Sequence, residues 1–346
     1  MRLGVLTGGG DCPGLNAAIR AIVRRALHEP DTKVLGFKYG WAGLISGETV
    51  DLDLAATKGI VHRGGTILGT SRTNPYKDPS DERPVGAILA TLESLGIDAL
   101  VPIGGEDTLG VAMRLHEDEG VPIVGVPKTI DNDLSETDFT FGFQTAVQIA
   151  TDAIDRLHTT AESHNRVMVV EVMGRHAGWI ATYSGIAGGA DVILIPEKPF
   201  DIAEVAARIQ HRHDQGRLFS IVVAAEGAMP VGGEAVLSAG ETDAFGHTRL
   251  GGIGNWIQEQ LEKMTGFETR TTILGHVQRG GTPVAFDRVL ATRFGVAAAE
   301  AALTGQFGTM VAINGTSITL VSLASAVGKL KTIDPELVAV SEVFFG

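Results

Sequence analysis

The chain has 346 residues, 44% hydrophobic and 20% charged, and a formal net charge of −13. This length exceeds the usual size of one domain and predicts two lobes. The negative charge disfavours a nucleic-acid surface, although a locally positive pocket can still bind an anionic metabolite. Cys12 is the only cysteine, which excludes an intrachain disulfide, and the apolar runs are too short for a signal peptide or a membrane span. We therefore expect a cytoplasmic protein that binds neither nucleic acid nor membrane.

Two glycine-rich turns connect predicted strands to predicted helices in the first third of the chain. Residues 3–7 run into the segment 8–14, and residues 99–103 run into Gly104 and Gly105; a helix with one apolar face follows each turn. Such turns offer backbone N–H groups and a helix N-terminus to phosphate. Either turn alone is as easily a plain tight turn, and neither matches a Walker A loop or a G-x-G-x-x-G fingerprint. Their repetition favours a phosphate site.

The segment 127–133 follows the short apolar run 121–126, which reads as a buried strand. In open α/β sheets, ligands bind at the carboxyl ends of the strands. Residues two apart in an extended chain point the same way, so we expect Asp131 and Asp133 to converge on one substrate, with Thr129 on the same side. Lys128 adds a positive charge to the same group.

The rest of the chain predicts a second parallel sheet, because strand-like and helical patterns alternate. The predicted strands cover 166–172, 190–195, 218–225 and 268–274, and the predicted helices cover 146–162, 175–187, 201–215, 251–265 and 287–303. Near the end, residues 310–323 are typical of a hairpin with a primed turn at Asn314 and Gly315.

Charged residues gather at the ends of these predicted strands. Glu106 and Asp107 occupy a phosphate cradle, where carboxylates either hold Mg²⁺ beside a phosphate or stabilise the helix dipole. Glu226 ends another strand and alone means little. Arginine is suited to phosphate, and Arg166 and Arg175 bracket one strand. Three further donors, Arg270, His276 and Arg279, lie within ten positions of a Gly-Gly turn and predict a phosphate pocket.

Five segments in this order resemble the phosphofructokinase family, and the resemblance runs from Gly4 to about Arg288. They are Gly-Gly-Gly-Asp-Cys-Pro-Gly at 8–14, Gly-Gly-Glu-Asp-Thr at 104–108, Lys-Thr-Ile-Asp-Asn-Asp at 128–133, Val-Glu-Val-Met-Gly-Arg at 170–175 and Leu-Gly-His-Val-Gln-Arg-Gly-Gly at 274–281.

The resemblance implies transfer of a phosphoryl group to O1 of fructose 6-phosphate, a reversible step of glycolysis and gluconeogenesis. It implies that Asp131 is the base and that Thr129 and Asp133 position the sugar. Glu106 would hold Mg²⁺, although the family more often has aspartate there, and Gly10 would approach the donor. The implied sugar-phosphate contacts are Met173, Gly174, Arg175, Glu226, His276 and Arg279, with Arg166 and Arg270 reaching in from a neighbouring subunit of a homodimer or homotetramer.

The resemblance also bears on the phosphoryl donor. ATP-using members usually have glycine at the position of Asp107, and many have glycine at that of Lys128, whereas pyrophosphate-using members resemble this chain at both. A carboxylate at Asp107 would repel a nucleotide α-phosphate, and Lys128 would stabilise charge on the transferring group. We therefore expect pyrophosphate as donor, with Asp107 and Lys128 in the catalytic and donor-binding set.

The expected fold class is α/β, with two Rossmann-like three-layer α/β/α lobes, mostly parallel sheets and an active site in the cleft between them. We predict a donor lobe at 1–141 plus 278–325 and a fructose 6-phosphate lobe at 142–277 plus 326–346. Two alternatives remain: an ATP-dependent 6-phosphofructokinase, and a non-catalytic regulatory subunit that binds sugar phosphate. A dinucleotide-dependent oxidoreductase is disfavoured because its fingerprint is missing from the sequence.

Overall fold

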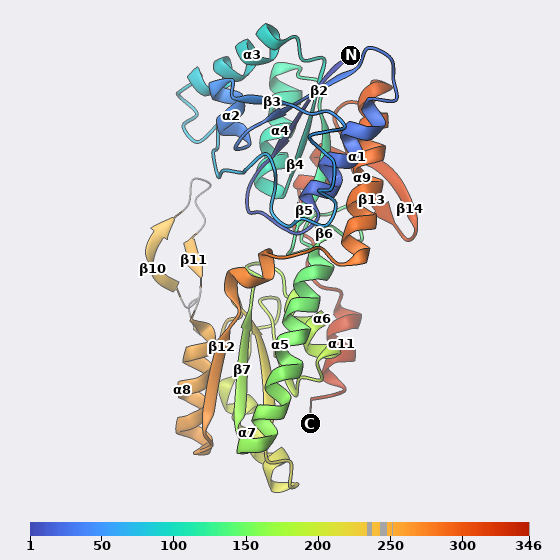
Figure 1. Ribbon diagram of the computed structural model, residues 1–346. Coiled ribbons are helices and arrows are strands. Elements are labelled where there is room, and N and C mark those ends of the chain that lie inside the picture. The colour runs from blue at the N-terminus through green and yellow to red at the C-terminus, as the bar shows by residue number, and fades with distance from the viewer. Residues whose placement is uncertain (234–236, 243–247, 251, 346) are drawn as a thin grey trace.

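The computed structural model describes residues 1–233, 237–242, 248–250 and 252–345. Figure 1 shows two α/β lobes stacked one above the other, each with helices on both faces of a sheet. The predicted fold class is thereby confirmed. No helix within these described ranges is both long and apolar enough to cross a bilayer.

The upper lobe in Figure 1 is built on a mostly parallel sheet of eight strands. The strand order is β14-β13-β5-β4-β1-β2-β3, and β6 pairs with β5. Its strands are β1 (Arg2–Thr7), β2 (Lys33–Phe37), β3 (Thr49–Asp51), β4 (Ala99–Gly104), β5 (Val124–Thr129), β6 (Phe141–Gly142), β13 (Thr309–Asn314) and β14 (Ser317–Ser322). Only the outer pairs β2–β3 and β13–β14 are antiparallel among these strands.

Helices cover both faces of this sheet. On one face, a hydrophobic core packs α1 (Leu15–Ala26) and α9 (Ala285–Leu303) against the strands. On the other face, a second core packs the strands against α2 (Trp41–Ser46), α3 (Arg83–Leu95), α4 (Glu106–Glu119) and α10 (Leu323–Val327). The predicted apolar face of α1 is confirmed, since Leu15, Ala18, Ile19, Ile22, Val23 and Ala26 are all buried.

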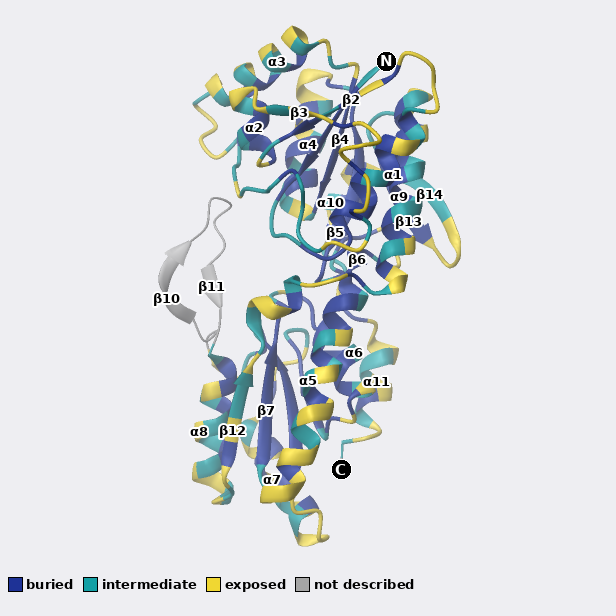
Figure 2. Ribbon diagram, in the orientation of Figure 1, coloured by how far each residue is buried: buried dark blue, intermediate teal, exposed yellow. Residues whose placement is uncertain are grey.

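The second lobe has a parallel sheet in the order β12-β7-β9-β8, which confirms the predicted second sheet. Its strands are β7 (Val167–Val172), β8 (Val192–Leu194), β9 (Ser220–Ala225) and β12 (Thr269–Ile273). Helices α5 (Phe143–His164) and α6 (Trp179–Ala187) cover one face, and α7 (Ile202–Asp214) and α8 (Ile253–Thr265) cover the other. Helix α11 (Pro335–Glu342) packs beside α6. Figure 2 shows β7 buried between partly exposed helices, whereas the edge strand β12 is only partly buried.

Two local predictions require correction, and one element was missed. The helix predicted over 175–187 begins only at Trp179, because the chain first forms a loop in which Gly174 has a φ of 136°. The hairpin turn lies one residue later than predicted: Asn314 pairs with Ser317, and Gly315, with a φ of 59°, occupies the turn. The antiparallel pair β10 (Leu237–Thr242) and β11 (Thr248–Leu250) was not predicted from the sequence. Residue 251, where a predicted helix begins, lies outside the described residues.

A buried carboxylate ties the start of α9 to the start of α5. The Asp287 side chain accepts hydrogen bonds from the backbone N–H of Thr145 at 2.7 Å and from its hydroxyl at 2.5 Å. The N–H of Val284 donates to the same hydroxyl at 3.1 Å. Desolvation raises the pKa of Asp287. The fully buried side chain of Asp287 therefore holds the starts of α5 and α9 together where the two lobes join.

We expect Asp287→Ala to lower the free energy of unfolding by about 2–4 kcal/mol, because it leaves the buried donors of Thr145 without an acceptor. Urea unfolding followed by circular dichroism measures this loss. Glu117→Ala, which removes an exposed helical carboxylate on α4, should change stability by less than about 0.5 kcal/mol. Equal stability of the two variants would refute the capping role of Asp287.

Candidate active site

Three neighbouring parallel strands of the first sheet end at one edge. Strand β1 continues into the turn at residues 8–10, β4 leads through Gly105 into α4, and β5 ends at Thr129. A Cβ built on Gly8 would lie 2.6 Å from Thr108 Oγ1, so only glycine allows this approach of the first turn to α4. The two predicted phosphate-binding turns are therefore packed together.

Lys128 brings a buried positive charge to these turns. Its Nζ donates to the carbonyl oxygen of Gly10 at 2.6 Å, and its residue exposure is only 4%. Desolvation lowers the pKa of Lys128, and Arg279 lowers it further. A Cβ on Gly10 would overlap the Arg279 guanidinium, whose Nε is buried without a hydrogen-bond partner. Two cations thus meet at Gly10, in an arrangement that favours a bound anion.

The loop 131–138 places carboxylates next to this positive group. The backbone N–H of Asp131 donates to Thr129 Oγ1 at 3.0 Å, and its Oδ1 is buried without a partner. The sequence predicted an extended chain here, and this prediction was wrong. Asn132 adopts the left-handed conformation with a φ of 51°, which bends the chain. The Asn132 side chain stabilises this bend by bonding to the carbonyl of Asp138 and the N–H of Thr140.

Asp131 and Asp133 nevertheless lie near enough to interact. The pKa of Asp133 is raised to about 7, mainly by desolvation and also by the negative charges of Asp131 and Glu106. Three carboxylates from two neighbouring strand ends therefore share one poorly hydrated region, where a cation would relieve their repulsion.

The carboxyl edge of the second sheet faces this region. Met173, Gly174 and Arg175 follow β7, Glu226 follows β9, and His276 and Arg279 lie in the 3₁₀ turn η1 (Gly275–Arg279) that follows β12. Desolvation raises the pKa of Glu226 to about 7; the charge of Asp131 raises it and that of Arg175 lowers it. The Arg279 guanidinium donates to the carbonyl of Asp11 at 3.4 Å, so the turn after β12 reaches the turn after β1 and the two sheet edges meet there.

Tight backbone packing fixes the loop after β7. A Cβ on Gly227 would overlap the carbonyl oxygen of Arg175, and the N–H of Gly227 donates to the Gly174 carbonyl at 3.1 Å. Gln278 is a residue that our sequence reasoning missed: it is fully buried, and its Oε1 accepts from the N–H of Met173 at 3.4 Å. Its place between His276 and Arg279 was the signal that could have identified it.

Arg166 and Arg270 do not join this group within one chain. They lie at the amino ends of β7 and β12, and the register pairs Arg270 with Met168. Arg166 precedes Met173 by seven positions, a separation of roughly 20 Å along a strand. Both arginines form ion pairs with Glu268, and Arg270 also pairs with Glu262 at 3.3 Å.

Glu106 and Asp107 occupy the first turn of α4, next to the carboxylate region. Across the described part of the chain, no group of three His, Cys, Asp or Glu side chains forms a complete metal site. Mg²⁺ commonly binds through one or two carboxylates together with substrate phosphates and water, so this arrangement fits a metal that arrives with its phosphate.

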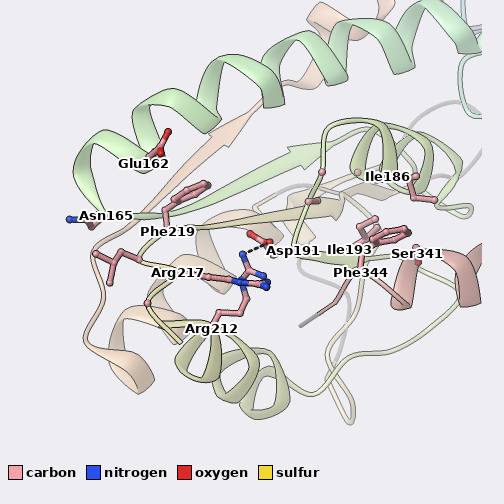
Figure 3. A pocket seen from close by; sticks show the side chains of 15 residues that line it. Glu162, Asn165, Ile186, Asp191, Ile193, Arg212, Arg217, Phe219, Ser341 and Phe344 are labelled. Atoms are coloured by element: carbon pink, nitrogen blue, oxygen red, sulfur yellow. Dashed lines mark ion pairs between the residues drawn. The ribbon is translucent and has the colours of Figure 1, made fainter. Parts of the chain in front are cut away.

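A cavity of about 730 Å³ opens elsewhere, at the amino-terminal end of the second sheet. Figure 3 shows Asp191 and Arg212 pointing toward each other there, joined by an ion pair of 2.6 Å. None of the predicted site residues lines this cavity, and the chemistry described above lies at the opposite end of the strands.

The fold is that of an α/β enzyme, and its charged side chains at two facing sheet edges are of the kinds that phosphoryl transfer requires. The Phosphofructokinase family profile matches residues 2–302, and the chain belongs to that family. It is 60% identical over 346 residues, all of both chains, to a pyrophosphate–fructose 6-phosphate 1-phosphotransferase of Streptomyces coelicolor. It is 56% identical over 334 residues, 96% of both chains, to ATP-dependent 6-phosphofructokinase 3 of the same organism.

A solved structure from Marinobacter aquaeolei, named a pyrophosphate-dependent phosphofructokinase, superposes with a TM-score of 0.82 and 25% identity. The alignment covers 97% of this chain and 86% of that one. The two-lobe arrangement is therefore the arrangement of the family.

The crowded carboxylates predict a pH-dependent stability. Folding raises the pKa of Asp133 from 3.8 to about 7. The contribution of Asp133 to the free energy of unfolding is therefore greatest below the unfolded-state pKa, where the carboxyl is protonated in both states. It is lost as the pH rises through the folded-state pKa. We expect Asp133→Asn to stabilise the protein, relative to wild type, by at least about 1 kcal/mol more at pH 8 than at pH 5.

Urea unfolding at the two pH values measures this difference. Asp155→Asn, on the exposed side of α5, is the matched control and should show none. A pH-independent effect of Asp133→Asn would mean that Asp133 ionises as an ordinary surface carboxylate.

Proposed function

We propose that the chain transfers a phosphoryl group from pyrophosphate to O1 of fructose 6-phosphate, reversibly, giving fructose 1,6-bisphosphate and phosphate. The observation that carries this proposal is the meeting of Lys128 and Arg279 at Gly10 beside the carboxylates of Asp131 and Asp133. In-line phosphoryl transfer needs positioning, charge neutralisation and a base that orients the nucleophile, and each has a candidate here.

On the acceptor side, Asp131 takes the proton from the 1-hydroxyl as the oxygen attacks phosphorus. Its buried Oδ1, which has no partner, is suited to accept that hydrogen bond. Asp133, in the same loop, and Thr129, at the end of β5, position the sugar. The sugar phosphate and hydroxyls are bound by Met173, Gly174, Arg175, Glu226, His276 and Arg279.

On the donor side, the glycine turn at Gly10 and the charge of Lys128 hold the transferring phosphoryl group. A desolvated cation stabilises developing charge more strongly than a solvated one. Asp107, in the first turn of α4, disfavours a further phosphate and nucleotide at this position. This chain is more than half identical both to a relative named for pyrophosphate and to one named for ATP, so overall identity does not decide the donor. The donor assignment therefore rests on Asp107 and Lys128.

Mg²⁺ is part of the proposal, with Glu106 as its protein ligand. The ion would neutralise the phosphoryl oxygens and lower the repulsion among the carboxylates. We assign the donor to the lobe of residues 1–141 plus 278–325 and the sugar phosphate to that of 142–277 plus 326–346.

Two rival functions are weaker. An ATP-dependent enzyme is favoured by the relative of that name at 56% identity, and is opposed by Asp107 and Lys128. A regulatory subunit without activity would not need the base, and this chain keeps Asp131 together with Thr129 and Asp133, which opposes that function.

We also propose that Arg166 and Arg270 bind the sugar phosphate of a neighbouring copy in a homodimer or homotetramer. Their position at the amino ends of β7 and β12, away from the carboxyl ends where the other candidate site residues lie, supports this proposal. The glutamates that pair with them hold the guanidinium groups in place at the surface.

The donor assignment predicts a change of specificity. Asp107→Gly should lower kcat/KM for Mg-pyrophosphate at least about tenfold, and the added change Lys128→Gly should raise activity with Mg-ATP, because repulsion of the longer donor is removed. Coupled assays with each donor measure both effects. Glu117→Gly, which removes a carboxylate farther along the same helix, is the control; pyrophosphate kinetics unchanged by Asp107→Gly would refute the assignment.

The shared site predicts complementation between two inactive variants. Asp131→Asn and Arg270→Ala should each lack activity alone, but an equal mixture of co-expressed subunits should recover roughly a quarter of wild-type activity, since half of the sites in mixed dimers are intact. If the arginines served their own chain, the mixture would stay inactive. Size-exclusion chromatography reports whether the subunits associate.

A further inference from the structure

Residues 329–333, which we call the linker, pass from the first lobe to the second. They follow α10, which packs on α4 and β13, and precede α11, which packs on α6. The lobe boundary predicted at residues 325 and 326 lies just before the linker, but the contacts of the linker were not predicted from the sequence. Its contacts connect the two sides of the cleft.

On the first-lobe side, the linker runs along the loop 131–138. Leu330 pairs with Leu134 in an antiparallel bridge, and the N–H of Lys331 donates to the carbonyl of Asp133 at 2.9 Å. The Lys331 ammonium then donates to the carbonyls of Thr137 at 2.8 Å and Asp138 at 2.6 Å. One residue thus holds both the beginning and the end of the loop that carries Asp131 and Asp133.

On the second-lobe side, the same residue contacts the start of α6. The indole N–H of Trp179 donates to the Lys331 carbonyl at 3.1 Å, and the ammonium lies 4.8 Å from the centre of the indole ring. Glu197 accepts from the N–H of Ile333 at 3.1 Å and from that of Gly178 at 3.0 Å. Gly178 ends the loop that begins with Met173, so the linker reaches the sugar-phosphate side as well.

We propose that Lys331 is a positioning residue for phosphoryl transfer, which sets the loop of Asp131 and Asp133 at its working distance from the sugar-phosphate loop 173–178. The proposal rests on the proposed function of those two loops. Lys331 itself contacts no reacting atom. It acts through backbone carbonyls on one side and Trp179 on the other, which fixes the geometry rather than the chemistry.

The charge of Lys331 also acts on the carboxylates. Desolvation lowers the pKa of Lys331 to about 8, while the negative charges of Asp138 and Asp133 raise it. The interaction is mutual, so the ammonium favours the ionised form of Asp133, which crowding by Asp131 and Glu106 disfavours. Removing this charge should shift the acidic side of the pH–rate profile toward higher pH.

The test compares Lys331→Met with Lys329→Met in the full-length protein. Lys329 lies in the same linker with an exposed side chain, so both changes remove one positive charge from one segment. For Lys331→Met we expect kcat to fall at least about tenfold, a KM for fructose 6-phosphate within about threefold of wild type, and an acidic limb at higher pH. Lys329→Met should match wild type, and Lys331→Arg should restore most of the activity.

Hydrogen exchange provides a readout that does not depend on turnover. Amides of residues 131–138 and 329–333 should exchange faster in Lys331→Met than in Lys329→Met, because the loop loses its anchor. If wild type turned over neither donor, the proposed function would fail while this comparison still decided the role of Lys331.

Wild-type kcat and pH profile in Lys331→Met would overturn the proposal, as would an equal loss in Lys329→Met. Should Lys331→Met fail to fold, Trp179→Phe is the second variant: it removes the N–H donor to Lys331 and keeps an aromatic ring. It should lower kcat in the same manner, and wild-type kinetics in Trp179→Phe would then contradict the proposal.

Discussion

The structure depends on the crowding of like charges in a poorly hydrated cleft. The negative charges of Asp131 and Glu106 act on Asp133, and Lys128 and Arg279 meet at Gly10. Such a set is unfavourable in the empty protein, because desolvation disfavours every charge in it. In the proposed function, a phosphoryl donor and a cation would make it favourable, since each group then gains a partner of opposite sign. The instability of the empty site and its affinity for a charged substrate have the same cause.

The fold makes this crowding possible by bringing the carboxyl ends of two parallel sheets to one cleft. Strands β1, β4 and β5 end on one side, which we propose binds the donor, and β7, β9 and β12 end on the other, which we propose binds the sugar. Glycines at positions 8, 10 and 227 allow contacts that a Cβ would block. The cleft is stabilised from outside by groups that touch no substrate, such as the buried Asp287 at the start of α9 and the linker around Lys331.

The fold class could be predicted from the sequence, because it depends on local apolar patterns. The candidate site residues could be proposed from the sequence, because they lie in short motifs. The apolar stripe of α1 and the glycine turns are visible in short segments. What escaped prediction depends on contacts between distant segments. The left-handed bend at Asn132 is stabilised by its side chain bonding to residues six and eight positions ahead, and Gln278 acquires its partner from β7 only in the folded chain. The linker pairs residues almost 200 positions apart.

The central claim is that Asp107 and Lys128 select a donor with two phosphates. The most direct test is the ratio of kcat/KM for Mg-pyrophosphate to that for Mg-ATP, measured on the wild-type protein with saturating fructose 6-phosphate. We expect pyrophosphate to be favoured at least about a hundredfold, equivalent to some 3 kcal/mol of transition-state stabilisation. Equal use of the two donors, or a preference for ATP, would contradict it.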